Sequence, residues 1–366
     1  MTVVACTRIR GVPLILGDIL ISQQGPDRSR SIPTRQDAAS LLPPGYTVAS
    51  VRRKLVVLSD RLAIAWAGHE VAARAVVADL RDVAREPNLE RDRLFTFLDE
   101  YPHFRKRVSC QLVGWLVDGR GPLAFHWDSA GHVWAGREEY VIGSGAEDFK
   151  ANAARRDVFY SDDVALTPDE QVTQIALILA GDAIGREMLS GEPLRHGYGG
   201  GMEVAVFAGG RFTVISDVCF LFWQAEMDVE EIDFRLAPVP TILKYLHVND
   251  CLVVHTSRIE RGEAVAQEVH VVTPVDREVE VSDFFPRFLS GQSAHYCNCF
   301  GGRVTGYGSV TGTMVMREPN RFIRFGQDVR DGKLEAEWLE VHSDFPALVY
   351  ETLKTALNNQ RGPASP

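Results

Sequence analysis

The sequence predicts an α+β fold in which two β-sheets are covered by helices on their outer faces. Three observations predict it. Strand-like apolar runs alternate with pairs of segments of helical periodicity, in the order strands, helix pair, strands, helix pair, strands. The 366 residues suffice for one large or two ordinary domains of about 150 residues each. The pattern then changes to short alternating stretches, so we expect an α+β domain over residues 1–225 and an additional β-rich C-terminal domain over residues 226–366.

Composition and charge exclude several classes of protein. Hydrophobic residues make up 45% and charged residues 24%, which excludes a disordered or low-complexity chain. The net charge of −10 argues against nucleic acid or an anionic membrane as a partner, because both need a basic face. No apolar run reaches the about 18 residues of a membrane helix, and the N-terminal run is too short for a signal peptide. Six irregularly spaced cysteines predict reduced thiols, so we expect a cytoplasmic protein.

The first residues predict a hairpin followed by a long loop. Thr2–Ile9 and Leu14–Ile21 are apolar or β-branched and are separated by Gly11 and Pro13. Residues 22–50 are rich in Gly, Pro, Ser and charged residues, which predicts a loop of a length that is usually functional.

The next elements follow from changes of period. Apolar residues alternate with polar ones or run together in the predicted strands, and recur every three or four residues from His69 onward in the predicted helices. In order, we predict strands Lys54–Ser59 and Leu62–Ala67, a helix from His69, a helix over Leu89–Tyr101, and strands Cys110–Val117 and Pro122–Trp127.

A second helix pair is predicted after Gly145. Its longer member starts at Pro168, because proline favours the first helical turn and the acidic pair Asp169 and Glu170 suits the positive end of a helix. Six apolar residues define its expected buried face: Val172, Ile175, Ala176, Leu179, Ala183 and Ile184. Strands Glu203–Phe207 and Phe212–Asp217 complete this part.

Short alternating segments predict the strands of the C-terminal part. They are Leu252–Thr256, Glu268–Thr273, Glu278–Val281, Ser309–Met316, Phe322–Phe325 and Leu334–Val341. One helix, Phe345–Asn358, is predicted near the end, and residues 361–366 are predicted to be disordered.

Four segments carry a family resemblance. They are T-V-V-A-C-T-R-I-R-G-V-P-L-I-L-G-D from Thr2, K-L-V-V-L-S-D-R-L-A-I-A-W-A-G from Lys54, V-I-G-S-G-A-E-D-F from Val141 and Y-G-G-G-M-E-V-A-V-F-A-G-G-R-F from Tyr198. In this order they resemble the proteasome β-subunits and the HslV peptidase of bacteria, which are N-terminal nucleophile (Ntn) hydrolases. The resemblance covers residues 2–217 and does not reach residues 226–366.

The resemblance implies a fold, an activity and partners. It implies a four-layer αββα sandwich that hydrolyses amide bonds of a peptide or protein substrate without metal or cofactor. Members of this family assemble into rings, so a homo-oligomeric ring is expected here, and an unfoldase or regulator is a further expected partner. The C-terminal domain has no counterpart in the resemblance, and its role stays open.

Carried over position by position, the resemblance assigns roles to five residues. Thr2 matches the nucleophilic threonine, which is freed when Met1 is removed before a small residue. Its α-amine, with a pKa of about 7.7 to 8.0, can serve as the base for its own hydroxyl. Lys54, held by Asp18, would favour the alkoxide of Thr2 and depress the pKa of nearby cationic groups.

Two further matches complete the expected site. The Gly68 amide matches the oxyanion donor, and Ser144 matches the serine that hydrogen-bonds near the amine of the nucleophile. A purely structural role stays open for four of the five residues. Thr2 could be a plain strand residue, Lys54 the exposed end of a basic triplet, Gly68 a helix-start glycine and Ser144 a turn serine.

Three positions depart from the family pattern. His196 and Gly199 stand where an aspartate and a serine flank the tyrosine of the glycine-rich turn, and Leu20 stands where a polar or basic residue is usual. These departures support an alternative hypothesis, a catalytically inactive proteasome-like ring or scaffold protein. The segment between Asp18 and Lys54 is also longer than in the family, so its loop is expected over the substrate cleft.

Other reactive residues give weaker indications. Cys6 is expected to be a buried thiol. His295, Cys297 and Cys299 are residue types that zinc uses, but no fourth ligand is evident and a structural role is favoured. Gly306, Gly308 and Gly312 lack the lysine of a phosphate-binding loop and are expected to be bends in strands.

Overall fold

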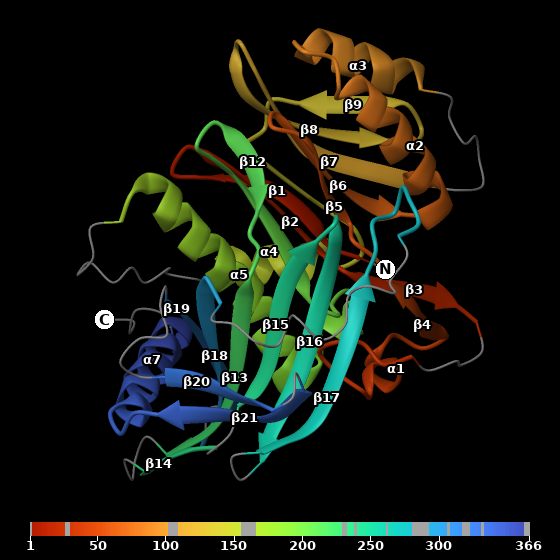
Figure 1. Ribbon diagram of the computed structural model, residues 1–366. Coiled ribbons are helices and arrows are strands. Elements are labelled where there is room, and N and C mark those ends of the chain that lie inside the picture. The colour runs from red at the N-terminus through yellow and green to blue at the C-terminus, as the bar shows by residue number, and fades with distance from the viewer. Residues whose placement is uncertain are drawn as a thin grey trace.

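The computed structural model of the protein (Figure 1) describes residues 2–25, 30–101, 109–154, 166–228, 233–237, 240–260, 263–279, 293–305, 308–316, 323–330 and 333–361. Helices and strands are both present over this part, which confirms the predicted α+β class. None of the helices described there is long and apolar enough to cross a membrane.

The first antiparallel sheet contains the N-terminal hairpin. Its strand order is β10-β1-β2-β11-β12. The strands are β1 (Val4–Ile9), β2 (Val12–Asp18), β10 (Glu139–Ile142), β11 (Met202–Ala208) and β12 (Arg211–Val214). The hairpin of β1 and β2 and the pair β11–β12 are confirmed, whereas β10 was not expected. Because β2 lies between β1 and β11, Asp18 is placed at the end of a central strand, opposite Met202.

The second antiparallel sheet has the order β5-β6-β7-β8-β9. Its strands are β5 (Leu55–Ser59), β6 (Leu62–Gly68), β7 (Cys110–Asp118), β8 (Gly121–Asp128) and β9 (His132–Ala135). Side chains of the two sheets meet in one buried cluster that includes Val4 and Ile15 from the first sheet and Ala65 and Trp115 from the second. The indole of Trp115 also donates a hydrogen bond to the Leu14 carbonyl at 3.0 Å, so the sheets are joined by polar as well as apolar contacts.

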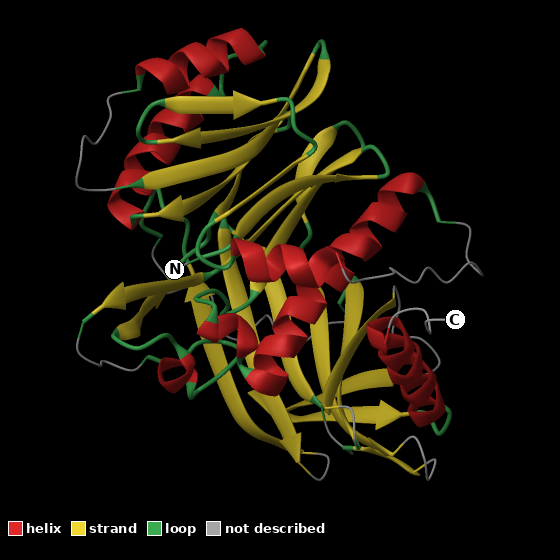
Figure 2. Ribbon diagram, turned by 180° about the vertical axis from the view of Figure 1, so that it is seen from behind, coloured by secondary structure: helices red, strands yellow, loops and turns green. Residues whose placement is uncertain are grey.

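Both predicted helix pairs are present, and each covers a different sheet (Figures 1 and 2). Helices α2 (Glu70–Val83) and α3 (Arg91–Glu100) share a buried cluster with the second sheet. Helices α4 (Ala146–Ala154) and α5 (Pro168–Ser190) share another with the first sheet. The α5 start is confirmed at Pro168, after a Thr167–Glu170 capping box.

The prediction of a loop over residues 22–50 is wrong in part. It contains part of β3 (Leu20–Gln24), the short helix α1 (Ala38–Leu41) and most of β4 (Tyr46–Val51), and β3 pairs with β4. The physical reason is a small apolar cluster that sequence composition does not reveal. It joins Leu20, Ile32, Ala38, Leu42 and Val48 to Leu194 of α6 (Glu192–Arg195). Residues 26–29 lie outside the described residues.

A third sheet follows in the C-terminal part, with the order β17-β16-β15-β13-β18-β19, and with β14 paired to β13. Its strands are β13 (Val218–Asp228), β14 (Asp233–Leu236), β15 (Thr241–Val248), β16 (Cys251–Glu260), β17 (Glu263–Val272), β18 (His295–Val304) and β19 (Gly308–Met316). The sequence analysis missed β13, β14, β15 and β18. The expected domain boundary after residue 225 falls inside β13, and the two-domain division stays a prediction.

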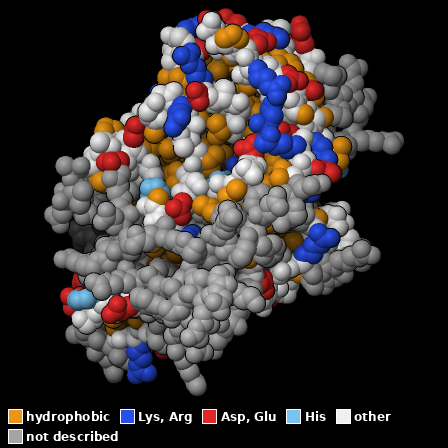
Figure 3. All heavy atoms as spheres, in the orientation of Figure 1, with side chains coloured by type: hydrophobic (Ala, Val, Ile, Leu, Met, Phe, Trp, Pro, Cys, Tyr) orange, Lys and Arg blue, Asp and Glu red, His pale blue; other side chains and the backbone are white. Residues whose placement is uncertain are grey.

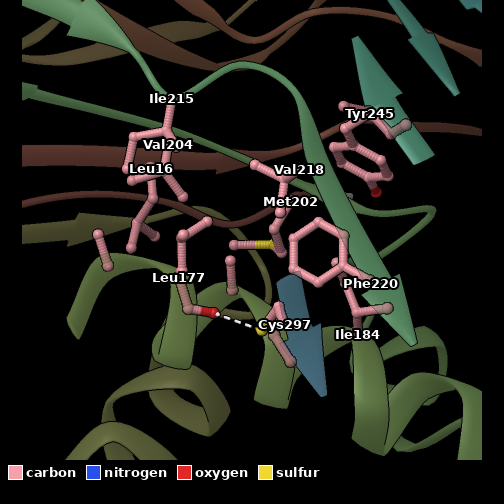
Figure 4. Close-up of a cluster of buried hydrophobic side chains, with 14 of the residues drawn as sticks. Leu16, Leu177, Ile184, Met202, Val204, Ile215, Val218, Phe220, Tyr245 and Cys297 are labelled. Atoms are coloured by element: carbon pink, nitrogen blue, oxygen red, sulfur yellow. Dashed lines mark hydrogen bonds between the residues drawn. The ribbon is translucent and has the colours of Figure 1, made fainter. Parts of the chain in front are cut away.

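Helix α5 packs between the first and the third sheet. One buried cluster contains Leu16 and Val204 of the first sheet, Leu177 and Ile184 of α5, and Phe220 of β13. Figure 4 shows these side chains together, with the Cys297 thiol donating a hydrogen bond to the Leu177 carbonyl at 3.5 Å. The helix is therefore buried on more than the single face that the sequence analysis expected.

The remaining C-terminal elements are β20 (Ile323–Arg330), β21 (Lys333–Val341) and α7 (Phe345–Arg361). They agree with the predicted strands near residues 322 and 334 and with the predicted helix, which packs on the third sheet through Phe345 and Leu353. The strand predicted over Glu278–Val281 is wrong at Glu278 and Val279, which form no strand. Residues 280–281, 322 and 362–366 lie outside the described residues.

The face seen in Figure 1 carries an uneven distribution of side chains. Figure 3 shows hydrophobic side chains exposed over its upper part, with lysine or arginine and acidic side chains around them.

Two glycines of α5 give a test of how closely this helix packs on the third sheet. A Cβ at Gly181 would lie 2.6 Å from Cys297 Sγ and 2.9 Å from Thr313 Cγ2, whereas a Cβ at Gly185 would meet Cys299 and Phe222 only at 3.6 Å. We expect Gly181→Ala to lower the free energy of unfolding by about 1–3 kcal/mol through overpacking. Gly185→Ala is the matched control and should be neutral or stabilising, because alanine is the better helix former by about 1 kcal/mol. Thermal denaturation measures the stability of both variants. Equal changes in the two would contradict the closer packing of the third sheet at Gly181.

Candidate active site

Thr2 lies just before β1 and is only 4% exposed. The pairing of Val4 with Gly17 in the hairpin brings Thr2 beside Asp18, at the end of the neighbouring strand. The Thr2 hydroxyl donates a hydrogen bond to Asp18 Oδ1 at 2.6 Å, and the Val3 amide donates to the same oxygen at 2.9 Å. The hairpin register thus fixes the threonine hydroxyl against a buried carboxylate.

Lys54 reaches the same carboxylate from the second sheet. Its ammonium donates to Asp18 Oδ1 at 2.7 Å and to the Leu20 carbonyl at 2.6 Å, and the Lys54 side chain is 1% exposed. Gly17 of β2 lies beside this pair: a Cβ there would be in ordinary contact with Lys54 Cβ at 3.6 Å and in tighter contact with Val4 Cγ1 at 3.1 Å. Burial lowers the pKa of Lys54, and the negative charge of Asp18 opposes that effect.

Ser144 and its neighbouring glycines surround Thr2 from a third direction. The Thr2 nitrogen donates to Ser144 Oγ at 2.9 Å, and the Gly145 amide donates to the Thr2 carbonyl at 3.0 Å. Strand β10 delivers this turn to Thr2, because Ile142 pairs with Val4. Gly143 has φ of 100° and a side chain there would collide with the Thr2 carbonyl, so the turn requires glycine.

Gly68 ends β6, opposite Cys110, and is exposed. The strand is tied to the site because the Trp66 amide donates to the Lys54 carbonyl at 3.1 Å. Gly68 is not among the hydrogen-bond partners of Thr2. Its role as oxyanion donor therefore stays a prediction, whereas Thr2, Asp18, Lys54 and Ser144 are in direct contact.

A second buried carboxylate, Glu187 of α5, lies behind the site, and the sequence analysis missed it. The Gly199 amide donates to Asp18 Oδ2 at 3.0 Å, and the next amide, Gly200, donates to Glu187 Oε1 at 2.9 Å. The Thr34 hydroxyl also donates to Glu187. Two consecutive amides thus bind two carboxylates. The available signal was its position: Glu187 follows Ala183 by four residues and Ile184 by three, so it continues the apolar face that was predicted for α5.

Glu187 explains one departure from the family pattern. Gly199 has φ of 142°, and a Cβ there would lie 2.7 Å from Glu187 Oε2. A serine at position 199 has no room beside this carboxylate. Burial raises the pKa of Glu187 to about 7, and the nearby charge of Asp18 also raises it, so the group titrates near neutral pH.

The other two departures have different surroundings. Leu20 contributes its backbone carbonyl to Lys54, while its side chain packs in the apolar cluster with Ile32 and Val48. His196 is half exposed and its Nε2 lies 3.5 Å from Asp148 Oδ1. The Tyr198 hydroxyl donates to the other Asp148 oxygen at 2.7 Å. Neither the Leu20 side chain nor the His196 side chain is among the hydrogen-bond partners of Thr2.

The cysteines are buried. Burial raises the pKa of Cys6 and of Cys110 to about 12, so neither is a reactive thiolate at neutral pH. Cys297 and Cys299 of β18 pack against α5, near Gly181.

Of the glycines that were expected to be bends in strands, Gly308 and Gly312 belong to β19, and residue 306 lies outside the described residues.

One group of possible metal ligands occurs among the described residues. It consists of Asp148, Glu192 and His196, whose ligand atoms lie within 4.8 Å of one another. The Arg186 guanidinium already lies 3.3 Å from Asp148 and 3.4 Å from Glu192. This guanidinium supplies the positive charge that a metal ion would otherwise provide. Asp148, Glu192 and His196 are therefore explained as part of an ion-pair network with Arg186.

No protein-family model and no curated protein sequence matches this chain. The chemistry of the site therefore has to be argued from the geometry described above.

The buried Asp18–Lys54 pair gives a stability prediction. Asp18→Asn leaves the Lys54 ammonium buried without a counter-charge, and we expect a loss of about 3–5 kcal/mol in the free energy of unfolding. The double variant Asp18→Asn/Lys54→Met should lose clearly less than the sum of the single variants. Urea denaturation measures the cycle. Asp82→Asn breaks an exposed pair with Arg85 and should cost less than about 1 kcal/mol. If the losses of the two single variants add up to the loss of the double variant, a direct interaction between Asp18 and Lys54 is contradicted.

Glu187 gives a pH prediction. Its pKa is raised from 4.5 to about 7 in the folded state. The folded protein therefore holds a proton that the unfolded chain has released, and stability should fall by about 3 kcal/mol as pH rises from about 4.5 to 7. Glu187→Gln removes this contribution, so the melting temperature of the variant relative to wild type should rise over that range. Glu100→Gln, an exposed control, should show no such trend, and a flat difference for Glu187→Gln would contradict the raised pKa.

Proposed function

We propose that the protein is an N-terminal threonine hydrolase that cleaves amide bonds, most directly those of peptides. One observation carries the proposal: the Thr2 hydroxyl and the Lys54 ammonium donate to the same oxygen of Asp18, at 2.6 and 2.7 Å. These residues are 16 and 36 positions away from Asp18 in the chain. A buried threonine hydroxyl beside a carboxylate and an ammonium is a typical arrangement for an activated nucleophile.

The proposal includes the four-layer αββα sandwich of the Ntn hydrolases. Its support is that α2 and α3 pack on the second sheet, α4 and α5 pack on the first, and the two sheets share an apolar cluster. The third sheet is an addition to this arrangement, on the side of α5 away from the first sheet.

The proposed reaction uses groups of this chain alone. Removal of Met1, which lies outside the described residues, turns the Thr2 nitrogen into an α-amine beside Ser144 Oγ. This amine accepts the proton of the Thr2 hydroxyl while Oγ1 attacks the substrate carbonyl carbon. The tetrahedral oxyanion accepts a hydrogen bond from the Gly68 amide. The amine then protonates the leaving nitrogen, and water hydrolyses the ester on Thr2.

Lys54 and Asp18 set the electrostatics of this reaction. The ammonium of Lys54 is close to the developing alkoxide through their shared Asp18 oxygen, and it stabilises negative charge there. It also disfavours a second positive charge nearby, which lowers the pKa of the α-amine and keeps it available as a base.

The alternative is a catalytically inactive scaffold of the same fold. The observation that favours it is the 4% exposure of Thr2, because a nucleophile has to reach its substrate. The departures at His196, Gly199 and Leu20 agree with this alternative, although Glu187 occupies the space of the missing serine.

Turnover of fluorogenic peptides tests the proposal. Thr2→Ala removes the nucleophile, and we expect a loss of at least about 10³-fold in kcat/KM, because covalent catalysis supplies several kcal/mol of barrier lowering. Thr2→Ser should retain part of the activity. Thr47→Ala is a matched control, because Thr47 is also a buried threonine and its hydroxyl has no hydrogen-bond partner in the part of the chain that the structure describes.

Intact-mass measurement completes the test. Wild type should lack Met1 and gain one adduct with an epoxyketone or boronate, and Thr2→Ala should gain none. Retained Met1, or equal turnover by wild type and Thr2→Ala, would contradict the hydrolase and support the scaffold.

A further inference from the structure

A cavity of about 480 Å³ opens at the edge of the two sheets. Its walls come from β8, β9, β10 and helix α4. The polar, charged and aromatic residues of its lining are His126, Trp134, Arg137, Glu139, Tyr140 and Lys150. None of the proposed catalytic residues lines it, so it is a separate cavity.

The wall of this cavity holds unused hydrogen-bonding capacity. Both atoms concerned are buried: among the described residues His126 Nε2 has no hydrogen-bond partner, and the Tyr140 hydroxyl donates to none. Tyr140 as a whole is 7% exposed. Buried polar groups without partners cost free energy, and in native proteins they are few. Two of them in the wall of one cavity indicate that a ligand supplies the missing partners.

The charges around the cavity favour an anion. Arg137 and Lys150 contribute two positive charges to the lining, and Glu139 contributes one negative charge. Lys150 also lies 3.2 Å from Glu147, but the Glu147 side chain is 91% exposed and this pair is weak. Burial lowers the pKa of His126, so its ring is neutral at pH 7 and Nε2 can donate a hydrogen bond in one tautomer.

The rest of the lining is apolar and firmly held. Val141 and Ile142 of β10 line the cavity, and Trp134 stacks on His126 with ring centroids 4.7 Å apart. Trp134 also stacks on His132 at 5.5 Å, so both neighbours hold its indole ring in place while 41% of the residue stays exposed. A large exposed aromatic side chain beside apolar residues is typical of a ligand-binding surface.

From these observations we propose that the cavity binds a small amphipathic organic anion, with an apolar body against Trp134, Val141 and Ile142. Its carboxylate or phosphate group lies between Arg137 and Lys150 and accepts a hydrogen bond from Tyr140. The site is independent of the proposed hydrolase activity.

Binding is measured by isothermal titration and by saturation-transfer NMR on the full chain, with benzoate, phenyl phosphate and inorganic phosphate as probes. We expect one of the two aromatic anions to bind in a 1:1 ratio and more tightly than inorganic phosphate. The tighter of the two identifies the anionic group. Tyr140→Phe keeps the ring and removes only the hydroxyl, and should weaken binding about tenfold, as expected for a hydrogen bond to a charged group.

Charge variants test the sign of the ligand. Arg137→Ala and Lys150→Gln are surface changes that should each weaken binding, whereas Glu139→Gln should strengthen it. Arg85→Ala, an exposed arginine of the segment after α2, is the matched control and should leave binding unchanged. Absence of binding by both aromatic anions at millimolar concentration, or unchanged affinity in Tyr140→Phe and Lys150→Gln together, would overturn the proposal.

Discussion

The ion pair between Asp18 and Lys54 is the constraint on which the rest of the site depends. Removing two charges from water costs several kcal/mol per ion, so both partners need strong compensation. Asp18 obtains it from four donors: the Thr2 hydroxyl, the Val3 amide and the Lys54 ammonium on one oxygen, and the Gly199 amide on the other. These donors come from three separate segments of chain, around residues 2–3, 54 and 199. The compensation therefore forces the N-terminus, two strand ends and the glycine-rich turn into one place.

Helix α5 extends this constraint to the C-terminal part. Its Glu187 binds the Gly200 amide behind Asp18, and its Asp182 accepts a hydrogen bond from the Thr311 hydroxyl of β19 at 3.0 Å. Arg53, the neighbour of Lys54, makes a parallel connection, because its side chain donates to Glu203 of β11 at 2.7 Å and to the Asp250 carbonyl at 2.6 Å. The site and the third sheet thus share buried polar contacts as well as an apolar core.

The local patterns that sequence reasoning uses worked well where an element buries one face. The hairpin β1–β2, helices α2 and α3, and the start of α5 follow from period, turn residues and capping residues such as Thr167 and Glu170. They failed where burial comes from distant segments. Strand β13 carries Phe220 and Trp223 on opposite faces, both covered, so its first six residues form a continuous apolar run without polar alternation. The segment of residues 22–50 looked polar because its few apolar residues are spread out and meet only after folding.

For the site, the sequence by itself determined which residue types are present and in what order: a threonine at position 2, an aspartate ending the second strand, a lysine opening the next sheet and a serine between two glycines. Only the tertiary structure decided that the hydroxyl of Ser144, 142 residues away in the chain, hydrogen-bonds to the backbone of Thr2. It accepts from the Thr2 nitrogen and donates to the Thr2 carbonyl. Only the tertiary structure added Glu187, because burial raises its pKa while hydrogen bonds from Thr34 and Gly200 oppose that rise. The physical reason is that hydrogen-bond partners and desolvation are properties of neighbours in space, which a linear pattern does not contain.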